Sequence, residues 1–462
     1  MSASASTFGW DTVFAIRVSD ANAQLARAAA YPARFSGQQD DIAIAGTFGP
    51  WRITRGGGGT NLRFAVPILT GTMSGMGQSA AMDGAVATIE LALNLIPQPG
   101  ATATRGRNNL IARTTPPQPD QPAVAVTALT FPGGHDPCRM ASSLMQGALG
   151  DWFNANLAAF THVFATVDLN TVADSGQFAW LVPTYSGYAY VDGADDDSSY
   201  LGLLSAVGGD PAGTLSGELS TACIPAGARA GFSISERSFL GQLLMPALPS
   251  AFPGAQAGDF ALSADGTTVT NTADVNTRTV EHGGITYQPR VEQLSITVAG
   301  TELQVFMQSR TQISPGIDAC VKSTAYMALV LDTSSGEPKL TWNQTRDPLT
   351  EHWTETAPGI EVAEILLTII AAVIVIVLGI LTDSAFFVVA AIIVGLVFGF
   401  AAATPQLIAA VAGKSVGDEV PSLDALALNA TDPITWSGAA AFKLTSAGLN
   451  GAFQLGGDPC FV

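Results

Sequence analysis

The chain has 462 residues, of which 47% are hydrophobic and 13% charged, and its formal net charge is −18. A chain this acidic lacks the basic surface that nucleic acid phosphates require. We therefore expect no nucleic acid partner. The same charge opposes electrostatic docking on anionic membranes at neutral pH. The length predicts two or three domains, and the hydrophobic content excludes a disordered chain.

The cysteines exclude two classes of small scaffold. They are far apart and form no C-x-x-C pair, which excludes a disulfide framework and a zinc module: Cys138, Cys223, Cys320 and Cys460. Met1 to Phe8 lack the basic and apolar regions of a secretory signal. We therefore expect a cytoplasmic protein, whose release would need a non-classical route.

The first expected element is a helix from Asp11 to Tyr31, capped by Asp11 and ended by Pro32. Its apolar face would consist of Phe14, Val18, Ala21, Leu25 and Ala28. Strands at 51–54 and 62–66 then flank Gly56–Gly59. No helix and no Gly-Lys-Ser/Thr follow these glycines, so they predict a hairpin tip and not a phosphate loop. More strands reach Leu95, and a loop rich in Pro and Gly spans Pro97 to Pro122.

Asp136-Pro137 opens the second expected helix in the preferred order of cap and proline. Its buried stripe would be Met140, Leu144, Leu149, Phe153, Leu157 and Phe160. Strands follow at Phe178–Val182 and Tyr185–Val191. Four aspartates between 192 and 197 lack the spacing of a calcium loop and predict a solvated turn.

Ser233 and Glu236 form a capping box for the third expected helix, which Pro246 should kink and Pro249 should end. Its apolar residues are Phe239, Leu240, Leu243, Leu244, Ala247 and Leu248. A long antiparallel meander follows, because apolar residues alternate on either side of a turn at 299–300. The alternating residues are Leu294, Ile296 and Val298, then Leu303, Val305 and Met307, then Val321, Ala325, Met327, Leu329 and Leu331. Final strands are expected around 434–436 and 442–444.

The order of elements is helix and antiparallel strands, twice over. We therefore expect an α+β fold of two halves, each a helix with antiparallel strands. The expected domains are residues 1–232 and residues 233–462.

Two almost purely apolar runs, Ile365–Leu381 and Phe386–Ala403, predict an apolar helical hairpin within 360–412. Each run is slightly shorter than a membrane span, which needs about 20 apolar residues. No Lys or Arg occurs from Trp353 to Gly413, whereas inserted hairpins usually carry them at cytoplasmic ends. A permanent span, burial in the protein and conditional insertion all remain open. In the membrane alternatives, 365–403 contacts lipid through Ile374, Ile376, Phe386, Phe387 and Phe398.

No catalytic constellation is present in the sequence. It contains no G-x-S-x-G motif, no complete phosphate loop and no H-E-x-x-H motif, and the four histidines are scattered. His162, on an otherwise apolar helix, is expected to be structural, and His352 to lie beside a surface aromatic residue. We expect a protein that is not an enzyme and has no metal site and no cofactor.

Three segments resemble one known family. Phe8-Gly9-Trp10-Asp11-Thr12-Val13-Phe14 is similar to the start of the forty-seven-kilodalton and OrfX proteins of clostridial neurotoxin gene clusters. So are Trp51-Arg52-Ile53, Gly57-Gly58, Leu62-Arg63 and Pro67-Ile68, and the ending Leu449-Asn450-Gly451-Ala452-Phe453-Gln454-Leu455. The resemblance implies the tubular lipid-binding (TULIP) fold for both halves. In this fold a strongly curved antiparallel sheet wraps a long helix, and an acyl chain can bind between them.

We therefore expect non-enzymatic binding of lipid, or of another elongated apolar ligand, in a tubular groove. Its expected lining is Phe239, Leu243, Leu244, Leu294, Ile296, Val298, Leu303, Val305 and Met307. The apolar hairpin would be a lid or a membrane-touching element. The alternative is a membrane-inserting or complex-forming accessory protein of a toxin system, with a protein partner or as a homo-oligomer.

Overall fold

The computed structural model describes residues 4–39, 41–75, 77–98, 108–116, 118, 121–131, 139–167, 183–207, 215–332, 339–355, 368 and 434–461. These residues form two compact units, each assembled from separate parts of the chain. Unit 1 comprises Met1–Thr12, Pro225–Asp432 and Phe442–Asp458, and unit 2 comprises Val13–Ile224, Pro433–Ala441 and Pro459–Val462. The division into residues 1–232 and 233–462 stays a prediction.

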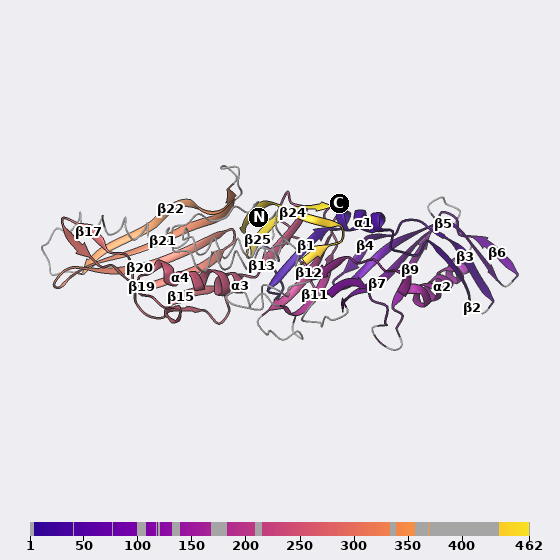
Figure 1. The fold of residues 1–462 in the computed structure, drawn as a ribbon, viewed down its shortest axis with the longest axis horizontal. Coiled ribbons are helices and arrows are strands. Elements are labelled where there is room, and N and C mark those ends of the chain that lie inside the picture. Colours follow the sequence, from indigo (N-terminus) through magenta and orange to yellow (C-terminus); the bar gives the residue numbers. More distant parts are fainter. Residues whose placement is uncertain are drawn as a thin grey trace. The chain divides into compact units, whose positions relative to one another are not determined.

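Unit 2 contains a large antiparallel sheet with the strand order β2-β3-β5-β7-β8-β10-β23, to which β4, β6 and β9 are paired (Figure 1). The bounds are β2 (Arg34–Gln39), β3 (Ile42–Phe48), β4 (Arg52–Gly58), β5 (Asn61–Gly75), β6 (Gln78–Ala81), β7 (Val86–Pro97), β8 (Asn108–Ala112), β9 (Val124–Thr130), β10 (Ala165–Val167) and β23 (Ile434–Trp436). The predicted hairpin around the glycine run is confirmed, because β4 pairs with β5 up to Gly58 and Asn61.

The described residues of unit 2 also form two helices, a short 3-10 turn and further strands. Their bounds are β1 (Thr12–Arg17), α1 (Val18–Ala28), α2 (Arg139–Asn156), η1 (Leu157–Ala159), β11 (Pro183–Val191) and β12 (Tyr200–Val207). Helix α2 packs against β2, β3 and β9. Their shared core is aromatic and includes Phe35, Phe48, Trp51, Trp152 and Phe153, with ring centroids 4.6 to 6.1 Å apart.

Unit 1 is dominated by a long antiparallel meander with the order β14-β15-β19-β20-β21-β22 (Figure 1). The bounds are β14 (Phe260–Leu262), β15 (Thr268–Asn271), β16 (Val275–Asn276), β17 (Val280–His282), β18 (Ile285–Tyr287), β19 (Arg290–Ala299), β20 (Glu302–Ser314), β21 (Ile317–Asp332) and β22 (Lys339–Glu355). The predicted turn between β19 and β20 is confirmed, with Gly300 at φ +69 where a side chain would be strained.

A helical segment from Glu236 to Ala251 lies beside this meander and contacts β14 and β15. It comprises α3 (Glu236–Ser238), the π-helical η4 (Phe239–Leu244), the 3-10 turn η5 (Met245–Ala247) and α4 (Leu248–Ala251). A further 3-10 turn, η6 (Ala257–Asp259), precedes β14, and β13 (Ala230–Ile234) pairs with β25 (Phe453–Phe461), which lies beside β24 (Ala439–Leu449). A curved antiparallel sheet with few helices agrees with the expected TULIP-like fold class.

Two expectations about where helices begin were wrong. Residues 12–17 of the expected first helix form the strand β1, and only 18–28 are helical. Thr12 to Ile16 are all buried, and continuous burial removes the alternation that distinguishes a strand from a helix. The expected capping box at Ser233 is also wrong, because Ser233 belongs to β13 and Ser235 caps the helix.

Other expectations fall outside the described residues. They include the apolar hairpin within 360–412, apart from Thr368, and the strand expected at Phe178–Val182. Among the described residues, no helix combines the length and apolar character that a membrane span requires.

Candidate functional site

The candidate site is the inner face of β19, β20 and β21 in unit 1. Residues that point to this face alternate with polar residues, as a sheet with one covered side requires. The registers are Ile296 opposite Val305 and Leu294 opposite Met307. In the next pair of strands, β20 and β21, Leu303 opposes Met327 and Val305 opposes Ala325. All of these side chains are buried, so the three strands present one continuous apolar surface that is excluded from solvent.

Eight of the nine side chains predicted to line the groove are buried, and Val298 is half-buried. The six sheet residues share one face, because residues directly opposite in antiparallel strands project to the same side. The three helix residues, Phe239, Leu243 and Leu244, lie in η4, which contacts β15. Strand β15 pairs with β19, where Val269 opposes Ile296. Whether these residues contact a ligand stays a prediction.

The helical segment is irregular where it meets the sheet. Pro246 has no N–H group to donate to the carbonyl four residues earlier, which disrupts regular helical bonding. The N–H of Met245 instead donates to the carbonyl of Leu240, a π-type bond. Phe239 stacks on Phe453 with ring centroids 5.6 Å apart. This contact anchors η4 to the C-terminal part of unit 1.

Sequence reasoning missed three hydroxyl residues on the same face: Ser309, Thr311 and Ser323. Their exposed fractions are 0%, 1% and 0%, and no hydrogen-bond partner of their hydroxyl oxygens lies among the described residues. The sequence does contain a pattern that marks two of these residues. The alternation of Leu303, Val305 and Met307 continues into Ser309 and Thr311, so hydroxyls occupy positions at which the pattern calls for apolar side chains.

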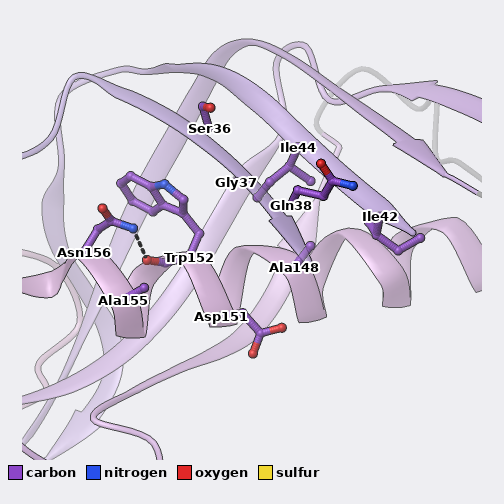
Figure 2. A pocket seen from close by; sticks show the side chains of 10 residues that line it. All are labelled: Ser36, Gly37, Gln38, Ile42, Ile44, Ala148, Asp151, Trp152, Ala155 and Asn156. Carbon is purple, nitrogen blue, oxygen red and sulfur yellow. Dashed lines mark hydrogen bonds between the residues drawn. The ribbon is translucent and has the colours of Figure 1, made fainter. Parts of the chain in front are cut away.

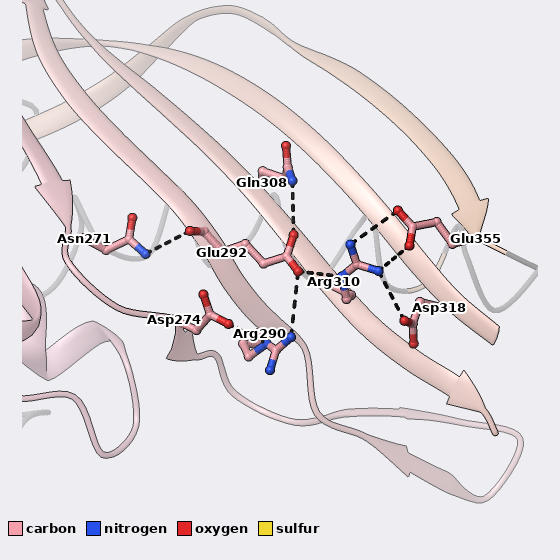
Figure 3. A network of polar contacts seen from close by, with 8 residues as sticks. All are labelled: Asn271, Asp274, Arg290, Glu292, Gln308, Arg310, Asp318 and Glu355. Carbon is pink, nitrogen blue, oxygen red and sulfur yellow. Dashed lines mark hydrogen bonds and ion pairs between the residues drawn. The ribbon is translucent and has the colours of Figure 1, made fainter. Parts of the chain in front are cut away.

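The opposite face of the same strands is polar and carries an ion-pair network (Figure 3). The Arg310 guanidinium bonds to Glu292 and Glu355 at 2.5 Å and to Asp318 at 3.2 Å. The hydrogen bond from Arg310 holds the pKa of Glu355 below its usual value. Arg346 lies 3.5 Å from the Tyr326 ring centroid and pairs with Glu302 at 2.6 Å. Charged groups and apolar groups are thus segregated to opposite faces of this sheet.

A second feature is a pocket of about 170 Å³ beside α2 in unit 2 (Figure 2). Trp152 on α2 lies beside Gly37 of β2, and Asp151 also lines the pocket. The remaining lining residues are Ser36, Gln38, Ile42, Ile44, Ala148, Ala155 and Asn156. Its volume suits one small group and is below the 300 to 1,000 Å³ of a typical ligand pocket.

The titratable residues singled out in the sequence have structural roles. His162 packs edge-on against Phe164, and burial lowers its pKa to about 4. Asp195 caps a turn by accepting hydrogen bonds from Ser198, and Asp196 accepts one from Asn22. In the part of the chain that is described, no group of His, Cys, Asp and Glu residues is arranged to hold a metal ion.

The predicted membrane-contact residues all lie outside the described residues: Ile374, Ile376, Phe386, Phe387 and Phe398. Thr368 is described, and its hydroxyl lies 3.1 Å from Nδ1 of His282 in β17.

Comparisons with known proteins give one consistent result. Protein OrfX3 of Paraclostridium bifermentans is 26% identical over 488 residues, and the alignment covers 98% of each chain. Protein OrfX3 of Clostridium botulinum strain Kyoto, type A2, is 26% identical over 486 residues with the same coverage.

Solved structures of P47 share the fold. The structure of P47 from C. botulinum A2 matches with a TM-score of 0.68 at 16% identity and 98% coverage of both chains. P47 of C. botulinum E1 matches with a TM-score of 0.66 at 16% identity, covering 98% of this chain and 100% of that one. The model of the OrfX-like family, described as Protein OrfX2/OrfX3/P47, matches residues 7–457. The chain therefore belongs to the OrfX-like family.

Proposed function

We propose that this protein binds a lipid, or another elongated apolar molecule, between the inner face of β19–β21 and the helical segment Glu236–Ala251, without a catalytic step. One observation carries the proposal: the inner face is apolar and excluded from solvent along successive residue pairs of three long strands. A surface of this shape matches an extended chain better than a compact molecule.

The expected affinity comes from apolar area removed from water. Each buried methylene group contributes about 0.8 kcal/mol, so affinity should rise with acyl chain length until the face is covered. We do not expect a positively charged side chain to bind a lipid head group at this face. Arg310 lies on the opposite face, where it is paired with carboxylates.

The direct test is native mass spectrometry of full-length protein purified without detergent, followed by lipid extraction. We expect co-purifying acyl chains at a defined stoichiometry. Val305→Trp should fill part of the inner face and lower the lipid-to-protein ratio. Phe306→Trp, at the adjacent outward position on β20, is the matched control and should leave the ratio unchanged. Melting curves verify that both variants fold. Wild-type protein that carries no lipid and takes up none would overturn the proposal.

The apolar hairpin within 360–412 would serve as the lid of this groove or as the element that touches a membrane. Its composition supports a second candidate function, conditional insertion, because the segment is apolar and free of Lys and Arg in an acidic chain. Protonation of carboxylates at low pH would then permit entry into a bilayer. Liposome leakage that rises below about pH 5 would support insertion. Leakage that does not depend on pH would exclude this mechanism.

An accessory protein could also use the hairpin as an oligomer interface. Light scattering of a variant that lacks 360–412 distinguishes this use from a lid. An oligomer that becomes a monomer on deletion supports an interface, whereas an unchanged state with faster lipid exchange supports a lid.

A further inference from the structure

The inner face of β20 and β21 contains a compact polar patch within its apolar surface. Ser309 and Thr311 are two residues apart on β20 and therefore project to the same side. On β21, Ser323 opposes Met307, and Val321 opposes Ser309. Ser323 is thus the diagonal neighbour of Ser309, so the three hydroxyls lie on adjacent strands of one face.

These hydroxyls are buried and lack partners among the described residues. The exposed fraction of each residue is 1% or less, and none of the three oxygens has a described hydrogen-bond partner. Buried polar atoms in native proteins are nearly always bonded, because an unsatisfied group is costly to bury. Three such atoms on one face require a hydrogen-bonding partner that the described residues do not supply.

The surroundings determine the charge of that partner. Val291 and Val321 oppose Ser309 on either side, and Ala319 opposes Thr311. Arg310 and Lys322 occupy intervening positions and project to the other face, where Arg310 is held by three carboxylates and Lys322 lies over Trp353. His352 opposes Val321 from the edge strand β22, and its side chain is exposed.

No buried cation therefore faces the patch from the described strands, and an ionised carboxylate or phosphate would lose its hydration there without compensation. An uncharged hydroxyl or carbonyl needs only the hydrogen bonds that Ser and Thr hydroxyls can donate and accept.

We propose that Ser309, Thr311 and Ser323 form a subsite for the uncharged polar group of a neutral lipid, such as the hydroxyl or ester carbonyl of a diacylglycerol. This inference rests on the proposed lipid-binding function and specifies its ligand class. The acyl chain would lie along Leu303, Val305 and Met307.

The test uses full-length protein stripped of bound lipid and probes delivered from cyclodextrin: dioleoylglycerol, oleate, dioleoylphosphatidylserine and hexadecane. Titration calorimetry should show at least tenfold tighter binding of dioleoylglycerol than of either charged lipid. The triple variant Ser309→Ala, Thr311→Val, Ser323→Ala should bind dioleoylglycerol about fivefold more weakly per hydrogen bond lost. Its affinity for hexadecane, which makes no hydrogen bonds, should be unchanged.

Two controls separate this effect from damage to the fold. Thr324→Val alters the neighbouring outward position on β21 and should leave all affinities unchanged. Ligand-free Thr311→Val should melt no lower than the wild type, because it removes an unsatisfied buried hydroxyl.

The possible outcomes distinguish the two proposals. Preference for oleate or phosphatidylserine, or a triple variant that binds dioleoylglycerol like the wild type, overturns the neutral-lipid subsite and leaves lipid binding intact. The second result would mean that water alone completes the hydroxyls. Failure of every probe to bind the wild type overturns lipid binding and the subsite with it.

Discussion

At the residue scale, Gly46 in β3 is required for the close approach of neighbouring groups. A Cβ atom added there would lie under 3.0 Å from the backbone carbonyl oxygen of Thr70 and from the Phe35 ring. The carbonyl belongs to the paired strand β5 and cannot move without breaking the ladder.

We predict that Gly46→Ala lowers the free energy of unfolding by about 1–3 kcal/mol, the usual cost of overpacking. Chemical denaturation of the full chain measures it. Gly58→Ala is the control, because an added Cβ meets no atom within 4 Å at that position. Equal stability of the two variants would show that the Gly46 contact relaxes without cost.

The second prediction at the residue scale concerns His162 and the dependence of stability on pH. Burial lowers the pKa of this imidazole from 6.5 to about 4. Between these values the unfolded chain takes up a proton that the folded chain does not, so stability must fall as the pH decreases from 6.5 to 4. The expected slope is about 1.4 kcal/mol per pH unit.

Replacing His162 by Gln should remove this contribution and flatten the dependence of the unfolding free energy on pH in that window. His352→Gln, at an exposed position, should retain the wild-type slope. Parallel curves for wild type and His162→Gln would contradict the lowered pKa.

At the element scale, the cap of the helical segment connects it to the start of the chain. The Ser235 hydroxyl oxygen accepts a hydrogen bond from the Ser238 amide at 3.1 Å. The Ser238 hydroxyl in turn donates to Oδ1 of Asp11 at 2.6 Å. The cap thereby orients the helix on which three predicted ligand contacts lie.

We predict that Ser235→Ala lowers the free energy of unfolding by about 1 kcal/mol, whereas Ser235→Asn, which can cap, loses much less. Denaturant titration of both variants provides the comparison. If Asn costs as much as Ala, the hydroxyl acts through its bond to the Ser238 side chain and not as a cap.

In helix α2, the sequence pattern alone does not determine which residues are buried. In α2, Met140 was expected to be buried and is 68% exposed, while the unpredicted Met145 is 0% exposed. Both residues are apolar, and the helix pattern alone permits either stripe. Packing of α2 against β2, β3 and β9 determines which of the two methionines is buried.

At the scale of the whole molecule, each compact unit requires distant parts of the chain. In unit 2, β10 pairs with β23, so Thr166 opposes Thr435. In unit 1, β13 pairs with β25, so Phe232 opposes Leu455. Separation of residues 1–232 from 233–462 therefore removes strands from both units.

We predict that neither half, expressed alone, gives a cooperative melting transition by circular dichroism. The control is full-length protein nicked at an engineered protease site between residues 224 and 225, which should stay folded because no strand is lost. A cooperative transition in either isolated half would support two independent domains.

The sequence by itself determined the features that depend on local periodicity and charge. The meander β19–β21, the turn at Gly300 and the residues that share one face all follow from alternation, which neighbouring residues encode. The burial of the five sheet residues Leu294, Ile296, Leu303, Val305 and Met307 could therefore be predicted, whereas their contact with a ligand stays a prediction.

Only the tertiary structure decided which continuous apolar stretch is a strand, as in β1, and which hydroxyls are buried without a partner among the described residues. Burial depends on surfaces supplied by residues far away in the chain, and no local pattern records them. For the same reason the pairing of β13 with β25, more than two hundred residues apart, could not be predicted from either segment.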